Sequence, residues 1–138
     1  MPPSDPRNAD TRRVAAVKTE GELRSAASSL TRLAAWLVVA GLVLLSVMPP
    51  AMRPVTSAPH ELEHFMSFAL AGALQYLAYA GRLARWLLIT LLFTAAIELL
   101  QLAVPGRHAR LADFAVDALA GYIGVLIGFV VSRALVVR

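Results

Sequence analysis

The chain contains no cysteine among its 138 residues. Disulfide bonds and thiolate metal sites are therefore excluded, and cysteine usage gives no information on the compartment. Charge is also scarce: charged residues make up 16% of the chain, whereas hydrophobic residues make up 58%. Together with a mean hydropathy of +0.64, this composition argues against a soluble monomer and for a membrane protein.

The few charged residues are mostly basic, with a net charge of +4 and a pI near 10.3. A nucleic-acid-binding surface would need a basic patch with interleaved aromatic residues. Here the basic residues fall between and outside the apolar segments. We therefore predict no nucleic-acid partner and expect anionic membrane lipids to provide the counter-charge.

Residues 1–29 are rich in proline, serine and charge and contain few large apolar side chains. Such a segment cannot bury enough surface to fold alone, so we predict a disordered, basic cytoplasmic tail, with helix, if any, near residues 20–28. A signal peptide would reach its apolar core soon after a short basic region, whereas about thirty residues precede the first apolar segment here. We therefore expect the first helix to be retained.

Residues 30–138 contain four apolar segments, and a helix needs about 20 mostly apolar residues to cross a bilayer. The segments cover approximately Leu33–Met48, His60–Ala80, Trp86–Val104 and Leu111–Val131. Pro49 and Pro50 end the first, and short turns make neighbouring helices antiparallel. The sequence predicts an all-α fold, an integral membrane bundle of four transmembrane helices.

The distribution of basic residues predicts the orientation of this bundle. One side of the membrane would carry Arg7, Arg12, Arg13, Lys18, Arg24, Arg32, Arg82, Arg85, Arg133 and Arg138, and the other would carry Arg53, Arg107 and Arg110. The excess persists when the residues before Arg24 are left out. By the positive-inside rule, both termini are expected in the cytoplasm.

The third segment carries two polar groups on one helix face. Glu98 and Gln101 are three residues apart, and Thr94 lies one turn earlier on that face. Glu98 would lie about 9 Å below the end of the segment at Val104. A charged carboxylate there costs about 2 to 4 kcal/mol, so it is expected to be neutral, paired or facing a wet cavity. Either function or simple locking of the helices would account for it, and Gln101 could hydrogen-bond across helices.

The fourth segment carries acids at its outer end and small residues below them. Asp113 and Asp117 are four residues apart, and Asp117 would lie near the depth of Glu98, so those two acids could be neighbours. The face continues with three glycines that let helix backbones approach closely, Gly121, Gly124 and Gly128. We expect a packing face, and the same glycines could also join copies of the chain in a homo-oligomer.

Polar residues of the second segment and of the turn before the fourth are expected near the same end of the bundle as Glu98 and Asp117. His60 and His64 lie one turn apart at the start of the second segment, and Arg107 lies in the turn before the fourth. An outward-facing polar pocket is predicted, suited to an anionic headgroup held by arginine and to proton transfer by Glu or His. The catalytic candidates are Glu98, His64 and Asp113, and the ligand-binding candidates are Arg107, Gln101 and Asp117.

A metal site is the chemical alternative at this pocket. His64, Glu63, Glu98 and Asp113 could bind zinc or manganese, since imidazole and carboxylate suit both ions. The spacing of these residues matches no zinc signature. We therefore predict no metal site, and the sequence indicates no particular cofactor.

The segments "HELEHFMSFALAG" and "IELLQLAVPGRHARLADFAVDALAGYIG" resemble the VanZ-like family, small four-helix bacterial membrane proteins named after a component linked to teicoplanin resistance. The resemblance covers residues 33–131. The residues that match the family pattern are His64 and Phe65, Glu98 and Gln101, the turn Pro105, Gly106 and Arg107, and Asp113. An Asn is common in the family where Asp117 stands.

The resemblance implies an envelope protein of the bacterial cytoplasmic membrane that binds or modifies an anionic lipid-linked precursor or lipid headgroup, with consequences for glycopeptide sensitivity. Whether it is an enzyme stays open. The alternative is a non-catalytic interaction protein whose polar residues fix helix packing. A small transporter is disfavoured, because four short spans leave little room for alternating access unless the protein oligomerises.

Overall fold

A computed structural model of the chain describes residues 6–49, 52, 60–104 and 111–136. The described residues form four helices and no strand. The helices are α1 (Pro6–Val47), α2 (His60–Tyr79), α3 (Leu83–Leu102) and α4 (Leu111–Val136). The prediction of an all-α fold with four helices is confirmed.

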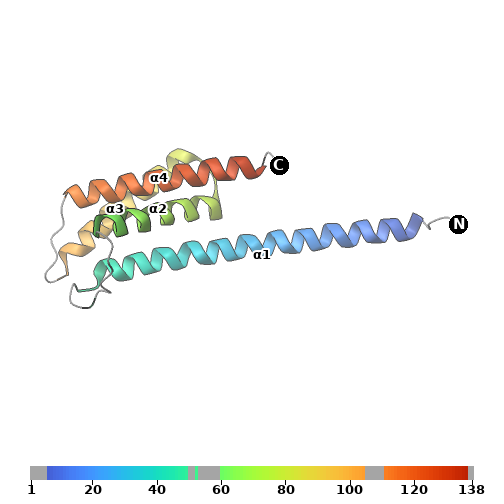
Figure 1. Ribbon diagram of the computed structural model, residues 1–138, viewed down its shortest axis with the longest axis horizontal. Coiled ribbons are helices and arrows are strands. Elements are labelled where there is room, and N and C mark those ends of the chain that lie inside the picture. Colours follow the sequence, from blue (N-terminus) through green and yellow to red (C-terminus); the bar gives the residue numbers. More distant parts are fainter. Residues whose placement is uncertain (1–5, 50–51, 53–59, 105–110, 137–138) are drawn as a thin grey trace.

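The bundle has two ends, which we name the loop end and the turn end. At the loop end α1 and α3 finish and α2 and α4 begin, whereas the turn end carries the Ala80–Arg82 turn and the last residues of α4 (Figure 1). α1 extends far past the turn end toward the N-terminus (Figure 1). The start of α1 and the end of α4 therefore both lie on the turn side of the bundle.

The turn between α2 and α3 is built from backbone conformation and aromatic side chains. Ala80 and Gly81 have positive φ angles of 44° and 116°, a left-handed conformation that glycine adopts readily and that ends a helix. The hydroxyl of Tyr76 donates a hydrogen bond to the carbonyl of Gly81 over 2.9 Å, and Nε1 of Trp86 donates to the carbonyl of Ala80 over 2.7 Å. These bonds satisfy carbonyls that the end of α2 leaves open.

The N-terminal segment differs from its predicted state. α1 begins at Pro6, so residues 6–29 are helical in the structure and continuous with the first apolar segment. The side chains of residues 18–30 are exposed. This part of α1 therefore packs against no other helix, and its composition alone does not predict a stable helix without tertiary packing. The described part of this segment, from Pro6, is continuous with the first apolar helix, and the assignment of residues 1–29 as a separate tail stays a prediction.

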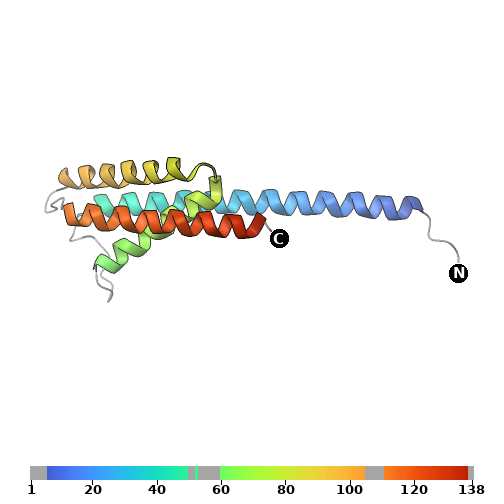
Figure 2. The same cartoon turned by 90° about the horizontal axis from the view of Figure 1, so that it is seen from above.

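Three helices are long and apolar enough to cross a membrane: Lys18–Val47 of α1, α3, and Leu111–Leu135 of α4. α2 is more polar, since it carries Glu63, His64 and Gln75. It runs obliquely past the other helices (Figure 2) and packs most extensively against α4 and next against α1. The helical membrane bundle is thus confirmed, with its most polar helix packed against the others.

α2 and α4 run in the same direction and keep one register along their contact. In most of their close contacts, an α2 residue lies opposite the α4 residue 53 to 55 positions later along the chain, and Gly72 also contacts Gly121. The facing pairs are His64 with Asp117, Phe68 with Gly121, Ala69 with Gly124, Gly72 with Val125, Ala73 with Gly128, and Tyr76 with Phe129. A single register therefore aligns the polar residues at the loop end and the aromatic residues at the turn end.

Glycines make this contact close. A Cβ added at Gly124 would collide with the backbone carbonyl of Ala69, and one added at Gly128 would lie 2.7 Å from the carbonyl oxygen of Ala73. A Cβ at Gly121 would meet Thr90 of α3. The three glycines of α4 thus pack against α2 and α3 of the same chain, as expected for a packing face. A homo-oligomer that used the same glycines would have to displace α2 and α3, and it stays a prediction.

The apolar core lies beside this contact. Leu42 of α1, Phe68 and Ala71 of α2, Ile97 of α3 and Ala120 of α4 are buried together. Ile97 is one residue before Glu98, so the core and the polar groups share the inner face of α3.

Gly124→Ala is expected to destabilise the bundle, because the added methyl group meets the Ala69 carbonyl. Overpacking of this kind costs about 1 to 3 kcal/mol, which should lower the melting temperature of the purified protein in detergent. Gly41→Ala is the matched control, since nothing lies within 4 Å of the Cβ added there. Equal melting temperatures for the two variants would contradict close packing of α2 on α4.

Candidate functional site

Polar side chains are buried mainly toward the loop end of the bundle. The buried polar residues in the described chain are Ser46 of α1, Thr94, Glu98 and Gln101 of α3, and Asp117 of α4. Buried polar groups cost free energy unless they are paired or bind something. Their concentration near one end of a membrane bundle therefore marks the candidate site.

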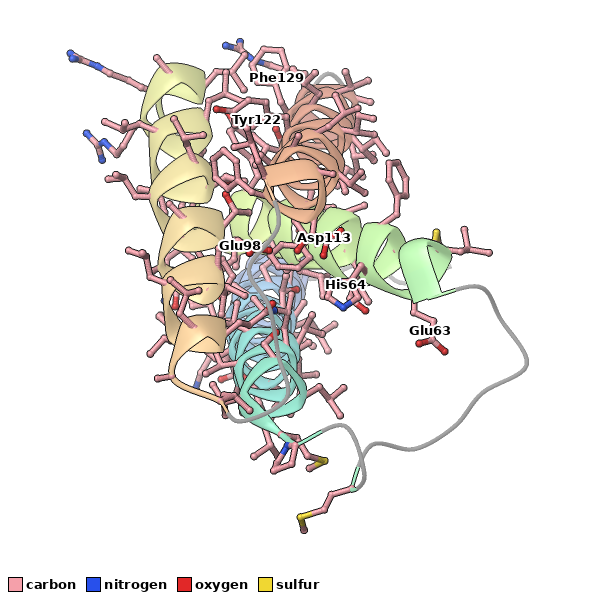
Figure 3. The ribbon with its side chains drawn as sticks, turned by 90° about the vertical axis from the view of Figure 1, so that its left-hand side faces the viewer. Glu63, His64, Glu98, Asp113, Tyr122 and Phe129 are labelled. Atoms are coloured by element: carbon pink, nitrogen blue, oxygen red, sulfur yellow. The ribbon has the colours of Figure 1, made fainter. Side chains whose placement is uncertain are left out.

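α3 presents its polar residues on its buried face. Thr94, Ile97, Glu98 and Gln101 are the buried residues of this helix, in the spacing that places side chains on one side of a helix. The hydroxyl of Thr94 donates to the carbonyl of Leu91 over 2.9 Å and is thus satisfied within α3. Glu98 points from α3 toward the other helices (Figure 3), so the predicted exclusion of Glu98 from lipid is consistent with the packing.

The closest polar contact between helices joins α2 to α4. Nδ1 of His64 lies 3.3 Å from Oδ2 of Asp117. The carboxylate is almost fully buried at 2% exposure, whereas the His64 side chain keeps 15%. The distance is longer than that of a strong charge-assisted hydrogen bond, but the contact orients the imidazole ring and offers Asp117 a partner. The sequence placed Asp117 beside Glu98 and did not foresee His64 as its partner.

The other predicted site residues lie in different surroundings. Asp113 is exposed in the first turn of α4, where a negative charge is favoured by the helix dipole. Thus Asp117, and not Asp113, contacts His64. Arg107, the predicted anion-binding residue, lies outside the described residues, as does His108 of the same turn. Glu63 lies apart from Glu98 and Asp113 (Figure 3), at the small cavity between α1 and α2.

A small cavity of about 70 Å³ lies against His64, between α1 and α2. Its polar lining consists of Ser46, Glu63, His64 and Ser67. The sequence reasoning assigned no role to the two serines. The sequence nevertheless indicates both serines as candidates. Ser46 is the only polar residue of the first apolar segment, and Ser67 lies three residues after His64, on the same helix face.

Near the loop end, two buried polar atoms lack a hydrogen-bond partner within the described ranges, namely Nε2 of Gln101 and Oδ1 of Asp117. Most buried polar groups in proteins are satisfied by protein atoms or water. One donor and one acceptor are therefore available here to water or to a ligand. This observation supports the prediction that Gln101 and Asp117 bind a ligand without testing it.

The metal alternative is not assembled by the residues in the described segments, among which no three His, Asp or Glu side chains converge. His64, Glu63, Glu98 and Asp113, the four residues of that alternative, all belong to these segments. The exposed position of Asp113 and the separation of Glu63 from Glu98 explain why the set does not come together.

The arrangement suits proton transfer and polar recognition. A carboxylate beside one ring nitrogen of a histidine fixes the orientation of the imidazole, and histidine is a common proton donor and acceptor near neutral pH. The small cavity gives a ligand or a water molecule access to the His64 side. Glu98 adds a second buried acid and Gln101 an amide donor on the facing helix.

Four helices in the described residues, three of them long and apolar enough to cross a membrane, and a buried polar cluster near one end define a small helical membrane protein. The family model of VanZ/LLP1 matches residues 56–132, more than half of the chain, and the chain belongs to this family. The match contains α2, α3 and most of α4 and begins after α1, later than the resemblance recognised from residue 33. No curated protein and no solved structure matches the chain.

A double-mutant cycle tests the coupling of His64 and Asp117. His64→Ala is expected to lower the free energy of unfolding by about 1 to 3 kcal/mol, because the buried Asp117 carboxylate loses its neighbour. Asp117→Asn combined with His64→Ala should reveal a coupling of about 1 kcal/mol, measured by denaturation in detergent. The control cycle pairs His64→Ala with Asp113→Asn, which is exposed and should be additive within about 0.3 kcal/mol. Equal coupling in both cycles would exclude a specific His64–Asp117 interaction.

Proposed function

We propose that this VanZ/LLP1 membrane protein binds the anionic headgroup of a lipid or of a lipid-linked cell-wall precursor at the loop-end polar cluster, and thereby alters glycopeptide sensitivity. The observation that carries the proposal is the 3.3 Å contact between His64 and the buried Asp117. It stands beside Gln101, whose buried amide is available to a ligand. Residues that served only to pack helices together would not need a buried amide donor that lacks a partner among the described residues, as Nε2 of Gln101 does.

The residues of the proposed site would have different chemical roles. Arg107 would bind the anion, since guanidinium forms paired hydrogen bonds with phosphate or carboxylate. Gln101 would position the ligand by hydrogen bonding, and Asp117 would orient His64. Either Glu98 or His64 would transfer a proton if a reaction takes place. Asp113 is assigned a weaker role at the entrance, because it is exposed at the start of α4.

The proposed location is the bacterial cytoplasmic membrane with both termini in the cytoplasm. Arg32, Arg82, Arg85 and Arg133 belong to the turn side of the bundle, and basic residues gather on the cytoplasmic face of membrane proteins. The loop end would then face outward. Lipid headgroups and precursors of the outer leaflet would reach the polar cluster from that side.

Single cysteines can test this orientation, because the natural chain has none. Met52→Cys, 70% exposed at the loop end, is expected to react with a membrane-impermeant maleimide in intact cells. Ala134→Cys, exposed near the end of α4, should react only after the membrane is opened. The reverse labelling pattern would invert the proposed topology and turn the polar cluster toward the cytoplasm.

The alternative function is a non-catalytic interaction protein. The observation that favours it is that His64 and Asp117 join two helices and would fix their packing without any ligand. Stability separates the two ideas. Because the His64–Asp117 pair stabilises the bundle in both cases, the discriminating residue is Gln101: Gln101→Leu should lower activity at nearly unchanged stability if the cluster binds a ligand, and should leave activity unchanged if the cluster only fixes helix packing.

Antibiotic survival tests the proposed function directly. In a sensitised bacterial host under glycopeptide, the wild-type protein should protect, whereas Asp117→Asn, Glu98→Gln and Arg107→Ala should not. Loss of a positioned acid or base lowers rates about 10² to 10⁴-fold, enough to abolish protection. The readout is the inhibitory concentration at matched membrane levels of each protein.

Glu22→Gln is the matched control, since it removes an acid from the exposed part of α1, far from the cluster. It should protect as well as wild type. Equal protection by all five proteins would show that the cluster is not the functional site. No protection by wild type would refute the effect on glycopeptide sensitivity.

A further inference from the structure

A second and larger cavity lies in the turn-end half of the bundle, between α1, α2 and α3. Its volume is about 450 Å³, within the range of small-molecule and cofactor sites in proteins. Aromatic side chains make up much of its lining, namely Trp36, Phe68, Tyr79, Trp86 and Phe93. Phe68 also borders the small cavity beside His64, so this residue separates the apolar cavity from the polar cluster.

The polar atoms of the aromatic residues mark the mouth of this cavity. Nε1 of Trp36 donates to the hydroxyl of Tyr79 over 2.6 Å, and Tyr79 stacks on Trp86 with ring centroids 6.3 Å apart. Nε1 of Trp86 donates to the carbonyl of Ala80 in the turn. Tryptophan and tyrosine favour the level of lipid headgroups, where one part of the ring is apolar and the other polar. The mouth therefore lies at the membrane–water interface.

Cationic groups lie at the same level. Arg85 lines the cavity, and the guanidinium of Arg32 lies 5.6 Å from the centre of the Tyr79 ring. Nε of Arg32 is 3.5 Å from the carbonyl oxygen of Ala78. None of the described residues that line the cavity is acidic. The mouth is thus complementary to an anion, and the interior is complementary to hydrocarbon.

The depth of the cavity fits one membrane leaflet. Its lining on α2 extends from Phe68 to Tyr79, which corresponds to about 16 Å of helix. Half of a hydrocarbon core about 30 Å thick is of the same length. An acyl chain entering at the turn end would therefore end near Phe68, in the middle of the bundle.

We propose that this cavity binds the acyl chain of an anionic phospholipid whose phosphodiester group lies beside Arg85. The site is separate from the loop-end polar cluster, since Phe68 is the one described residue that lines both this cavity and the small cavity beside His64. Trp36 and Trp86, the two tryptophans of the chain, both line it. Binding therefore places hydrocarbon against every intrinsic tryptophan fluorophore of the protein.

Fluorescence quenching by brominated lipid tests the proposal. The full chain is reconstituted in phosphatidylcholine vesicles that contain increasing mole fractions of either dibrominated phosphatidylglycerol or dibrominated phosphatidylcholine. Half-maximal quenching by the anionic lipid is expected at about fivefold lower mole fraction, because one arginine contributes about 1 kcal/mol toward anionic lipid. Both leaflets contain the probe, so the orientation of the protein in the vesicle does not affect the result.

Matched variants separate the cavity from the general charge of the surface. Arg85→Gln should abolish the preference for the anionic lipid, whereas Arg133→Gln, which removes a charge near the end of α4, should keep it. Val39→Phe narrows the cavity that it lines and should reduce quenching, whereas Leu37→Phe, exposed on α1, should not. Equal quenching by the two lipids, an equal effect of the two arginine variants, or an equal effect of the two phenylalanine variants would each overturn the proposal.

Discussion

The close approach of α2 and α4 is the constraint on which the rest of the structure depends. Gly124 admits the backbone of Ala69, and Gly128 admits that of Ala73. Inside a membrane the hydrophobic effect does not drive helices together, so packing of small residues provides much of the association. Because the contact tolerates no additional Cβ at these positions, it also fixes the register of the two helices.

That register determines the composition of the candidate site. It places His64 opposite Asp117 at the loop end and Tyr76 opposite Phe129 toward the turn end. A shift by one residue would rotate Asp117 away from the imidazole and leave a buried acid without this neighbour, at a cost that membrane interiors make high. Packing of small residues and pairing of polar ones therefore favour the same arrangement.

The two halves of the bundle present different chemistry. The loop end gathers His64, Glu98, Gln101 and Asp117, whereas the turn end encloses an apolar cavity with arginine at its mouth. Phe68 lies between them, with its ring centroid 6.2 Å from that of His64 and 6.3 Å from that of Phe93. Phe68 therefore forms part of the wall of both cavities.

The sequence by itself determined the class of the protein, the number of helices and the level at which polar groups gather. Hydropathy and prolines place both ends of the second and third apolar segments, the end of the first and the start of the fourth within a few residues of the observed helix ends, since the length needed to cross a membrane is reflected in local composition. The glycine spacing on α4 also revealed a packing face. The structure continues α1 back to Pro6, whereas composition alone indicated helix only near residues 20–28 of the polar segment.

Only the tertiary structure decided which residues meet. Helical spacing shows that Asp113 and Asp117 share a face of α4, but it does not show that α2 packs there in parallel and brings His64 to Asp117 while Asp113 stays exposed. The apolar cavity likewise draws on α1, α2 and α3, and no single segment predicts it. The physical reason is that partners across helices depend on register, which is set by contacts between residues some fifty positions apart.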